Sequence, residues 1–270
     1  GNGGVIDPNE GWWVEVTLDG QWVAQRVAPG EASARANIFR IGVVDFGDSA
    51  NFRYSADLVS YAARKGWYSG GPFDFTAIYA DPSRVASPYN TRRTWRIGEM
   101  LQDAVAARSV DPKLVMGILR DHYEGTPYDF TSGHAQGSPH QTDERTLCRL
   151  DTEVSTIISA RTHIRGQEVP PDIGGIAWRA LGTPCSSVYT PWYLGSQTIP
   201  ASFRTGSSQY TRHSAYWTAR DLSRTFDMRY REGMVHHVRD AQHLFEGRAF
   251  ADQAEVESKA LETDPAIERI

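Results

Sequence analysis

The chain has 270 residues, of which 40% are hydrophobic and 23% are charged. This composition is sufficient for a sizeable buried core, in one domain or in a large part of one. The 28 Lys and Arg residues are outnumbered by 33 Asp and Glu residues, for a net charge of −5. A nucleic-acid-binding protein needs a basic surface, so nucleic acid is not predicted as a partner. No apolar run approaches the roughly 20 residues that span a bilayer, so no membrane partner is predicted.

The chain begins with Gly1-Asn2-Gly3-Gly4 rather than with Met. We expect Gly1 to be a product of processing or truncation, and residues 1–10 to be a flexible start. A glycine loop that binds phosphate is the alternative, but the strand before and the helix after such a loop are missing. The two cysteines allow at most one disulfide and leave the cellular compartment open.

Strand patterns dominate the first forty residues. Three segments have the residue types and alternation of strands: residues 12–16, 21–27 and 34–41. Asp19-Gly20, between the first two, is typical of a β-hairpin turn. We therefore expect the three segments to form one antiparallel sheet.

Helix patterns follow in the next seventy residues. Apolar residues at helical spacing predict helices over residues 55–64 and about 91–107. Residues 73–81, between them, are predicted to be irregular. The second helix is expected to pack across a face of the sheet. Its predicted inward-facing residues are Ile97, Leu101 and Val105.

A short amphipathic helix is predicted after Asp111, the expected N-cap, with Pro112 at its first position. The helix leads into a turn that carries four ionisable residues: Arg120, Asp121, His122 and Glu124. Such a cluster is costly unless its members pair with one another or meet a charged ligand. A solvated loop with local ion pairs is the alternative to a functional role.

The second half of the chain alternates again between strand and helix patterns. Residues 131–144 form a predicted loop, and residues 214–261 a predicted helical region. Three strand candidates lie between them: residues 154–161, 175–180 and 187–193. No repeat and no linker divides the chain, so one domain is predicted over residues 1–270, with a helical C-terminal part over residues 214–270. The order of elements predicts an α+β sandwich.

Residues 120–129, Arg-Asp-His-Tyr-Glu-Gly-Thr-Pro-Tyr-Asp, resemble the signature of the dipeptidase A family of cysteine peptidases, which includes the secernins. The resemblance extends from about Asp7 to Phe203. Its further blocks occur in the family's order: residues 10–15, 22–27, 36–41, 89–95, and 174–178 with 187–193. It implies an N-terminal-nucleophile hydrolase with the αββα fold, two antiparallel sheets between helical layers.

Such an enzyme attacks an amide carbonyl with a Cys, Ser or Thr at its mature N-terminus, whose α-amino group can serve as the base. Residue 1 is Gly, and neither cysteine lies at a terminus. We therefore expect a missing upstream segment or a companion chain to carry the nucleophilic cysteine. The resemblance implies hydrolysis of dipeptides or small linear amides through an acyl-cysteine intermediate. It implies no metal and no organic cofactor, and it leaves homo-oligomerisation open.

The resemblance assigns catalytic roles to Asn37 and Arg93. In related amide hydrolases the Asn on this strand donates its amide N–H to the oxyanion; a side-chain hydrogen bond to nearby backbone is the alternative. Arg93 matches the family pattern Asn-x-x-Arg-x-Trp, together with Asn90 and Trp95. Its guanidinium could lower the pKa of the thiol or hold a carboxylate. We expect both side chains to converge on one cleft.

For Arg120, Asp121, His122 and Glu124 the resemblance gives a signature without individual roles. We predict that these residues bind substrate or order the site. For His122 we favour hydrogen bonds that order the loop over proton transfer, since the α-amine already supplies the base.

Two other groups are predicted to have no functional role. Cys185 is predicted to be a buried and inert thiol, because no base is placed beside it by a local signature. His236, Asp240 and His243 share one helical face and could bind zinc, but they lack a fourth ligand, and a solvated face is favoured.

Two other functions stay open. One is an amidase or acyltransferase for non-peptide amides, like the relatives that cleave bile-salt or penicillin side chains. The other is a non-catalytic subunit that kept the fold and lost the nucleophile.

Overall fold

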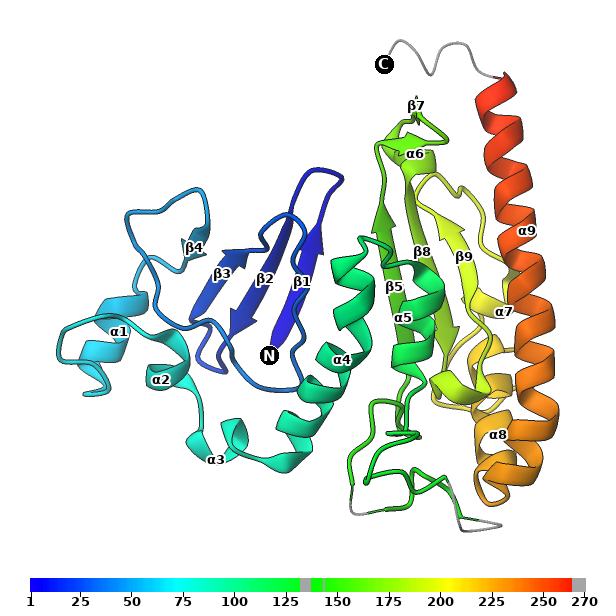
Figure 1. Ribbon diagram of the computed structural model, residues 1–270, viewed down its shortest axis with the longest axis horizontal. Coiled ribbons are helices and arrows are strands. Elements are labelled where there is room, and N and C mark those ends of the chain that lie inside the picture. Colours follow the sequence, from blue (N-terminus) through cyan, green and yellow to red (C-terminus); the bar gives the residue numbers. More distant parts are fainter. Residues whose placement is uncertain (132–136, 143, 264–270) are drawn as a thin grey trace. The chain divides into compact units, whose positions relative to one another are not determined.

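The computed structural model describes residues 1–131, 137–142 and 144–263. The predicted loop over residues 131–144 and the end of the predicted helical part therefore lie partly outside the described residues. The chain divides into two compact units, residues 1–110 and 111–270 (Figure 1). The single domain predicted over residues 1–270 stays a prediction. The division follows the end of a long helix, without a change in composition that would mark a linker.

Unit 1 contains an antiparallel sheet with the strand order β1-β2-β3-β4. Its strands are β1 (Asn2–Ile6), β2 (Gly11–Val16), β3 (Trp22–Arg26) and β4 (Phe52–Tyr54). The predicted hairpin is confirmed, because Val16 pairs with Trp22 across the turn. Gly20 has a φ of 79° there, a conformation that glycine adopts without steric cost.

Two expectations about this sheet differ from the structure. Residues 1–10, expected to be flexible, include the edge strand β1, which pairs along β2. The third strand predicted over residues 34–41 is wrong: β4 pairs with β3 instead. The reason is the fully buried Glu15, whose carboxylate accepts the backbone N–H groups of Arg40 at 2.8 Å and Ile41 at 3.1 Å. A strand ladder would need these donors for a neighbouring strand.

The helices of unit 1 are α1 (Leu58–Arg64), α2 (Phe75–Tyr79), α3 (Pro82–Val85) and α4 (Pro88–Ala106). The helices predicted over residues 55–64 and 91–107 are confirmed. The prediction of irregular structure over residues 73–81 missed α2, which begins after Asp74, a cap whose side chain accepts from the Ala77 N–H at 2.8 Å. The core of this unit consists of Val23, Ile41, Val44, Leu58, Ala62, Phe73 and Phe75.

The predicted inward face of α4 is half-buried at Ile97, Leu101 and Val105. Leu101 and Val105 line a pocket of about 290 Å³ with residues 32–34, which belong to the loop after β3. Packing of this helix across a face of the sheet stays a prediction.

Unit 2 is built on an antiparallel sheet with the order β5-β8-β9. Its strands are β5 (Val154–Ala160), β8 (Gly175–Leu181) and β9 (Thr190–Tyr193), and a small hairpin pairs β6 (His163–Ile164) with β7 (Gln167–Glu168). The first two predicted strands are confirmed. The third is shorter than predicted, because the 3₁₀ turn η1 (Pro184–Ser186) precedes it and β9 begins only at Thr190.

The helices of unit 2 are α5 (Pro112–Leu119), α6 (Pro171–Gly174), α7 (Ala201–Arg204), α8 (Ala215–Asp227), the π-helix η2 (Tyr230–Val238) and α9 (Arg239–Thr263). The predicted start of α5 is confirmed: Asp111 accepts from the Leu114 N–H at 2.8 Å. Helices α5 and α9 both contribute to the main core, where Phe250 stacks on the fully buried Trp178.

The predicted helical region after residue 214 contains an interruption that the sequence did not indicate. Between α8 and α9 the chain forms η2, a wider helical turn in which i→i+5 hydrogen bonds replace i→i+4 bonds. Gly233 permits the close approach of α8, since a Cβ atom there would lie 2.0 Å from the Phe226 ring. This interruption directs Tyr230 and Met234 into a small core with both cysteines.

The structure is therefore mixed α and β with antiparallel sheets, as the predicted α+β class requires. None of the helices in the described ranges is both long enough and apolar enough to cross a bilayer.

We predict that Glu15→Ala destabilises the protein strongly. The Arg35 Nε donates to the Glu15 carboxylate at 2.9 Å, so the substitution leaves this buried guanidinium without its counter-charge. Removal of one partner from a buried ion pair typically costs about 3–5 kcal/mol. Urea unfolding measures the loss. Glu10→Ala is the control, because Glu10 pairs with Arg26 at the half-exposed surface. Equal free energies of unfolding for the two variants would contradict this account of the segment from residue 34 to residue 41.

Candidate functional site

Arg93 lies in the second turn of α4 and is only 9% exposed. Its Nε donates to the carbonyl of Tyr89 at 2.7 Å. Its Nη2 donates to Asn90 Oδ1 at 2.8 Å and to Asn37 Oδ1 at 3.0 Å. The predicted convergence of Asn37 and Arg93 is therefore found, although 56 positions separate them in sequence.

Asn37 lies in a loop, and the prediction that a strand carries it is wrong. Its φ of 61° is in the left-handed region, which Asn tolerates better than most residues. Its neighbours Ala36 and Ile38 are buried and anchor the loop on both sides. The side chain of Asn2, in β1, donates to the Ile38 carbonyl at 3.0 Å.

The contact with Arg93 fixes the orientation of the Asn37 amide. A guanidinium only donates, so the oxygen of the amide must face it, and Nδ2 faces away. Within the described residues Nδ2 donates no hydrogen bond. Asn37 also lines a pocket of about 640 Å³ in unit 1, together with residues of β1, the β2–β3 turn, α2 and α3. Asn37 is therefore a pocket-lining residue whose amide is held through its oxygen and whose Nδ2 is available as a donor.

Arg120, at the end of α5, is held by four hydrogen bonds within unit 2. Its guanidinium forms a bidentate pair with the Glu246 carboxylate of α9, with Nη1 donating at 2.9 Å. Its Nε donates to the carbonyl of Pro184 at 2.9 Å, and its Nη2 to that of Ser187 at 2.8 Å. Arg120 therefore connects α5, η1 and α9.

Asp121 and Glu124 shape the turn that follows α5. Asp121 is buried, and its Oδ1 accepts from the Tyr123 N–H at 2.9 Å. The Asp121 carbonyl accepts from the Cys148 N–H at 3.1 Å. Glu124 accepts from the backbone N–H of His122 at 2.6 Å and from the His122 ring at 3.0 Å. The binding or ordering role of these residues stays a prediction.

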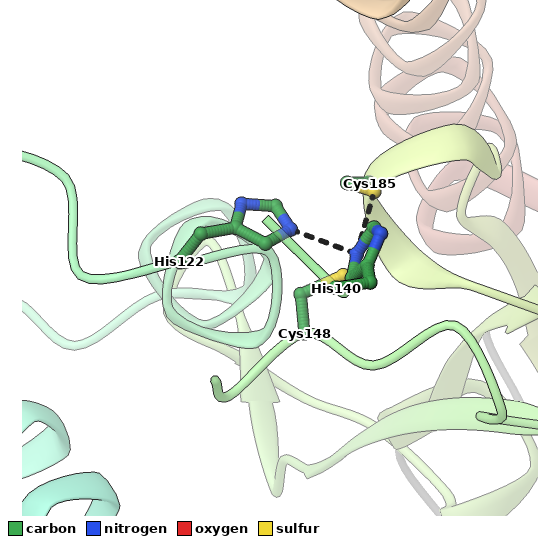
Figure 2. A group of neighbouring side chains, drawn as sticks. All are labelled: His122, His140, Cys148 and Cys185. Carbon is green, nitrogen blue, oxygen red and sulfur yellow. Dashed lines mark hydrogen bonds between the residues drawn. The ribbon is translucent and has the colours of Figure 1, made fainter. Parts of the chain in front are cut away.

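His122 points into a cluster that it shares with His140, Cys148 and Cys185 (Figure 2). The two imidazole Nε2 atoms are 3.0 Å apart, and Cys185 Sγ lies 3.7 Å from His140 Nε2. One nitrogen or sulfur atom from each of the four residues lies within 4.8 Å of the others. Both cysteines are free, and both are buried. Cys185 is buried as predicted.

Each imidazole of the cluster contacts a carboxylate with its other nitrogen. His140 Nδ1 lies 2.7 Å from Asp227 Oδ1, at the end of α8. His122 Nδ1 lies 3.0 Å from Glu124 Oε1 and 3.2 Å from the Tyr230 hydroxyl. An ionised carboxylate can only accept a hydrogen bond, so the Nδ1 atom of each ring carries the hydrogen that it donates. The Nε2 atom of each ring then faces the cluster.

The cluster also shifts the pKa values of its members. Burial disfavours the imidazolium form of His122, but the Cys148 thiolate and the Glu124 carboxylate outweigh burial and raise its pKa to about 10. Burial likewise opposes the Cys148 thiolate, yet contacts with Cys185 and both imidazoles hold its pKa well below the usual range. Burial and the Cys148 charge together raise the pKa of Cys185.

His236, Asp240 and His243 are all exposed. The π-helix η2, which contains His236, also disrupts the regular spacing on which the shared face depended. The sequence missed His140, Cys148 and Asp227 as partners of His122, because no local motif joins positions so far apart.

Comparison with known proteins supports the resemblance to the dipeptidase family. The family model described as peptidase family C69 matches residues 2–243. A probable dipeptidase of Salmonella dublin is 30% identical over 207 residues, which cover 70% of this chain and 46% of that protein. A probable dipeptidase A of Streptococcus pyogenes serotype M1 is 25% identical over 279 residues, covering 95% and 57%. The dipeptidase A of Lactobacillus helveticus is 24% identical over 243 residues, covering 83% and 49%.

The chain thus spans about half the length of the curated relatives that it matches. The family match includes Asn37, Arg93 and the segment from Arg120 to Glu124. Because it extends over most of the sequence and through both units, the chain belongs to peptidase family C69.

Proposed function

We propose that the protein containing this chain hydrolyses dipeptides or small linear amides through an acyl-cysteine intermediate. The family and the names of its dipeptidase relatives support the reaction class. The observation that carries the site assignment is the contact between Arg93 and the Oδ1 of Asn37, a residue that lines a pocket and whose Nδ2 is left free to donate.

Asn37 stabilises the oxyanion in this proposal. Attack of a cysteine sulfur on the amide carbonyl places negative charge on the carbonyl oxygen, and an amide N–H held in place beforehand can donate to it. Arg93 acts as a positioning residue, because its guanidinium fixes the Asn37 amide through Oδ1. Its positive charge also favours the negatively charged transition state.

The attacking cysteine is a third one, carried by another segment or by a companion chain. The only cysteines of this sequence are Cys148 and Cys185. Cys148 is fully buried and Cys185 is 7% exposed, so a peptide carbonyl has no access to either sulfur. The proton of the attacking thiol passes to the α-amine at the N-terminus and then to the leaving amine. Water afterwards hydrolyses the acyl-cysteine.

We further propose that the protein has the αββα fold of N-terminal-nucleophile hydrolases. A main antiparallel sheet with associated helices in each unit supports this assignment. Arg120, Asp121, His122 and Glu124 would then order unit 2 rather than bind substrate. The argument is that the Arg120 guanidinium already binds a carboxylate and two carbonyl groups.

We predict that Asn37→Ala lowers kcat and kcat/KM of dipeptide hydrolysis together, by about 10²–10³-fold, because an oxyanion donor acts mainly in the transition state. Steady-state kinetics on the protein complete with its nucleophile measure the effect. Asn9→Ala, in an exposed turn of the same unit, is the matched control. Unchanged kinetics in Asn37→Ala would remove Asn37 from the site. Activity on non-peptide amides alone would favour the amidase, and no activity in the unmodified protein would favour the non-catalytic subunit.

We predict that Arg93→Lys lowers kcat/KM by about 10²-fold, the loss typical of a small misplacement at a reacting centre. A lysine nitrogen cannot contact Asn37, Asn90 and the Tyr89 carbonyl in the same geometry. Because Arg93 acts through Asn37, the double variant Asn37→Ala/Arg93→Lys should be no slower than Asn37→Ala alone. Arg64→Lys, on the exposed face of α1, is the control. Additive losses in the double variant would mean that Arg93 acts on the substrate directly.

A further inference from the structure

The cluster of His122, His140, Cys148 and Cys185 has no role in the proposed reaction. It unites three separate parts of unit 2: the end of α5, the segments 137–142 and 144–153 before β5, and η1. Four side chains that can each supply one soft or borderline ligand atom meet at one point (Figure 2).

Two distances within the cluster are close to those of a tetrahedral metal site, and all four candidate ligand atoms lie within 4.8 Å of one another. With Zn–N near 2.0–2.1 Å and Zn–S near 2.3 Å, tetrahedral geometry places two nitrogens about 3.3 Å apart, nitrogen and sulfur about 3.6 Å, and two sulfurs about 3.8 Å. The observed separations are 3.0 Å between the imidazole nitrogens and 3.7 Å between His140 Nε2 and Cys185 Sγ. One central ion could therefore contact all four atoms after small side-chain adjustments.

The hydrogen bonds around the cluster also point to a cation. Asp227 and Glu124 contact Nδ1 of His140 and His122, so the two Nε2 atoms face each other, 3.0 Å apart. Two imidazole nitrogens at this distance need a cation between them, which is either a proton on one ring or a metal ion. Carboxylates on the far nitrogen of ligating histidines are the usual second shell of metal sites.

The Asp227 carboxylate is itself fixed on both oxygens. Ser138 donates to Oδ1, and the Gln141 side-chain amide donates to Oδ2 at 2.8 Å. Asp227 is 4% exposed. These donors fix the orientation of the Asp227 carboxylate, and the carboxylate in turn holds the His140 ring with Nε2 facing the cluster.

We propose that His122, His140, Cys148 and Cys185 form a structural zinc site. Two thiolates and two neutral imidazoles bring a charge of −2, which one Zn²⁺ neutralises, so the ion and its four ligands together carry no net charge. Four protein ligands leave no open position for water or substrate, which is the mark of a structural rather than a catalytic site. The ion would fasten the long segment before β5 to α5 and η1.

Three other arrangements are distinguished by the test. Cys148 and Cys185 could form a disulfide. The cluster could be held by protons alone. In the third, Cys185 is a nucleophile, His140 is its base and Asp227 orients the base. Against this, the His140 side chain is only 3% exposed, and the His122 ring already contacts His140 Nε2, the nitrogen that would take the proton.

The first experiment measures metal content in the complete protein, purified without a histidine tag, incubated with Zn²⁺ and dialysed. Elemental analysis should find about one zinc per chain, as a four-ligand site requires. The Cys148→Ser/Cys185→Ser variant should retain none, whereas His236→Ala/His243→Ala, which removes two exposed histidines, should retain the full amount. Zinc-free wild-type protein, or equal zinc in wild type and the cysteine variant, would overturn the proposal.

Loss of folding in the cysteine variant is separated from loss of ligands by measurements on folded protein. Replacement of zinc by Co²⁺ should produce a thiolate-to-cobalt charge-transfer band in the wild type. A thiol-modifying reagent should release the zinc as it reacts with both cysteines. Asp227→Asn should keep the site but raise the zinc dissociation constant by about 10–100-fold. Three results would each overturn the zinc proposal: the absence of a charge-transfer band, a Cys148–Cys185 disulfide in the native protein, or alkylation of Cys185 without release of zinc. None of them depends on the result of the dipeptidase assays.

Discussion

The structure depends on the rule that a buried charge needs a partner. In unit 1, the Glu15 carboxylate is fully buried and organises the segment from Arg35 to Ile41 around itself, which places Asn37 in its left-handed turn. Arg93 then meets the Asn37 oxygen from α4. In unit 2, the pair of Arg120 and Glu246 ties the end of α5 to α9. The candidate catalytic amide is thus placed by buried polar contacts rather than by a regular strand.

The same rule distinguishes the two cysteines of this sequence from the proposed nucleophile. Cys148 and Cys185 lie in a buried cluster with two imidazoles, whose outer nitrogens contact Glu124 and Asp227. A buried sulfur beside two imidazoles is a good ligand for a metal ion, and its burial argues against attack on a peptide carbonyl. The proposed peptidase reaction therefore needs a different cysteine. The zinc proposal and the dipeptidase proposal concern different units and do not depend on each other.

Local patterns predicted most of the longer elements. Asp19-Gly20 predicted the hairpin, and Asp111-Pro112 predicted the start of α5. The prediction of a strand over residues 34–41 was wrong although the residues alternate as in a strand. The conformation of this segment is set by its hydrogen bonds to Glu15, which is distant in sequence. The cluster around His122 was not predicted for the same reason: positions 122, 140, 148 and 185 follow no short ligand spacing. The pairing of Asn37 with Arg93 was reached only through the family resemblance.

The central claim is that this chain supplies the oxyanion donor and that neither of its cysteines is the nucleophile. Covalent trapping tests it most directly: the complete protein is treated with a dipeptide analogue that carries a thiol-reactive carbonyl group, and the labelled cysteine is mapped by mass spectrometry. We predict a single label on an N-terminal cysteine outside this sequence, with Cys148 and Cys185 unlabelled. A label on Cys185 or Cys148 that dipeptide substrate competes away would contradict the account.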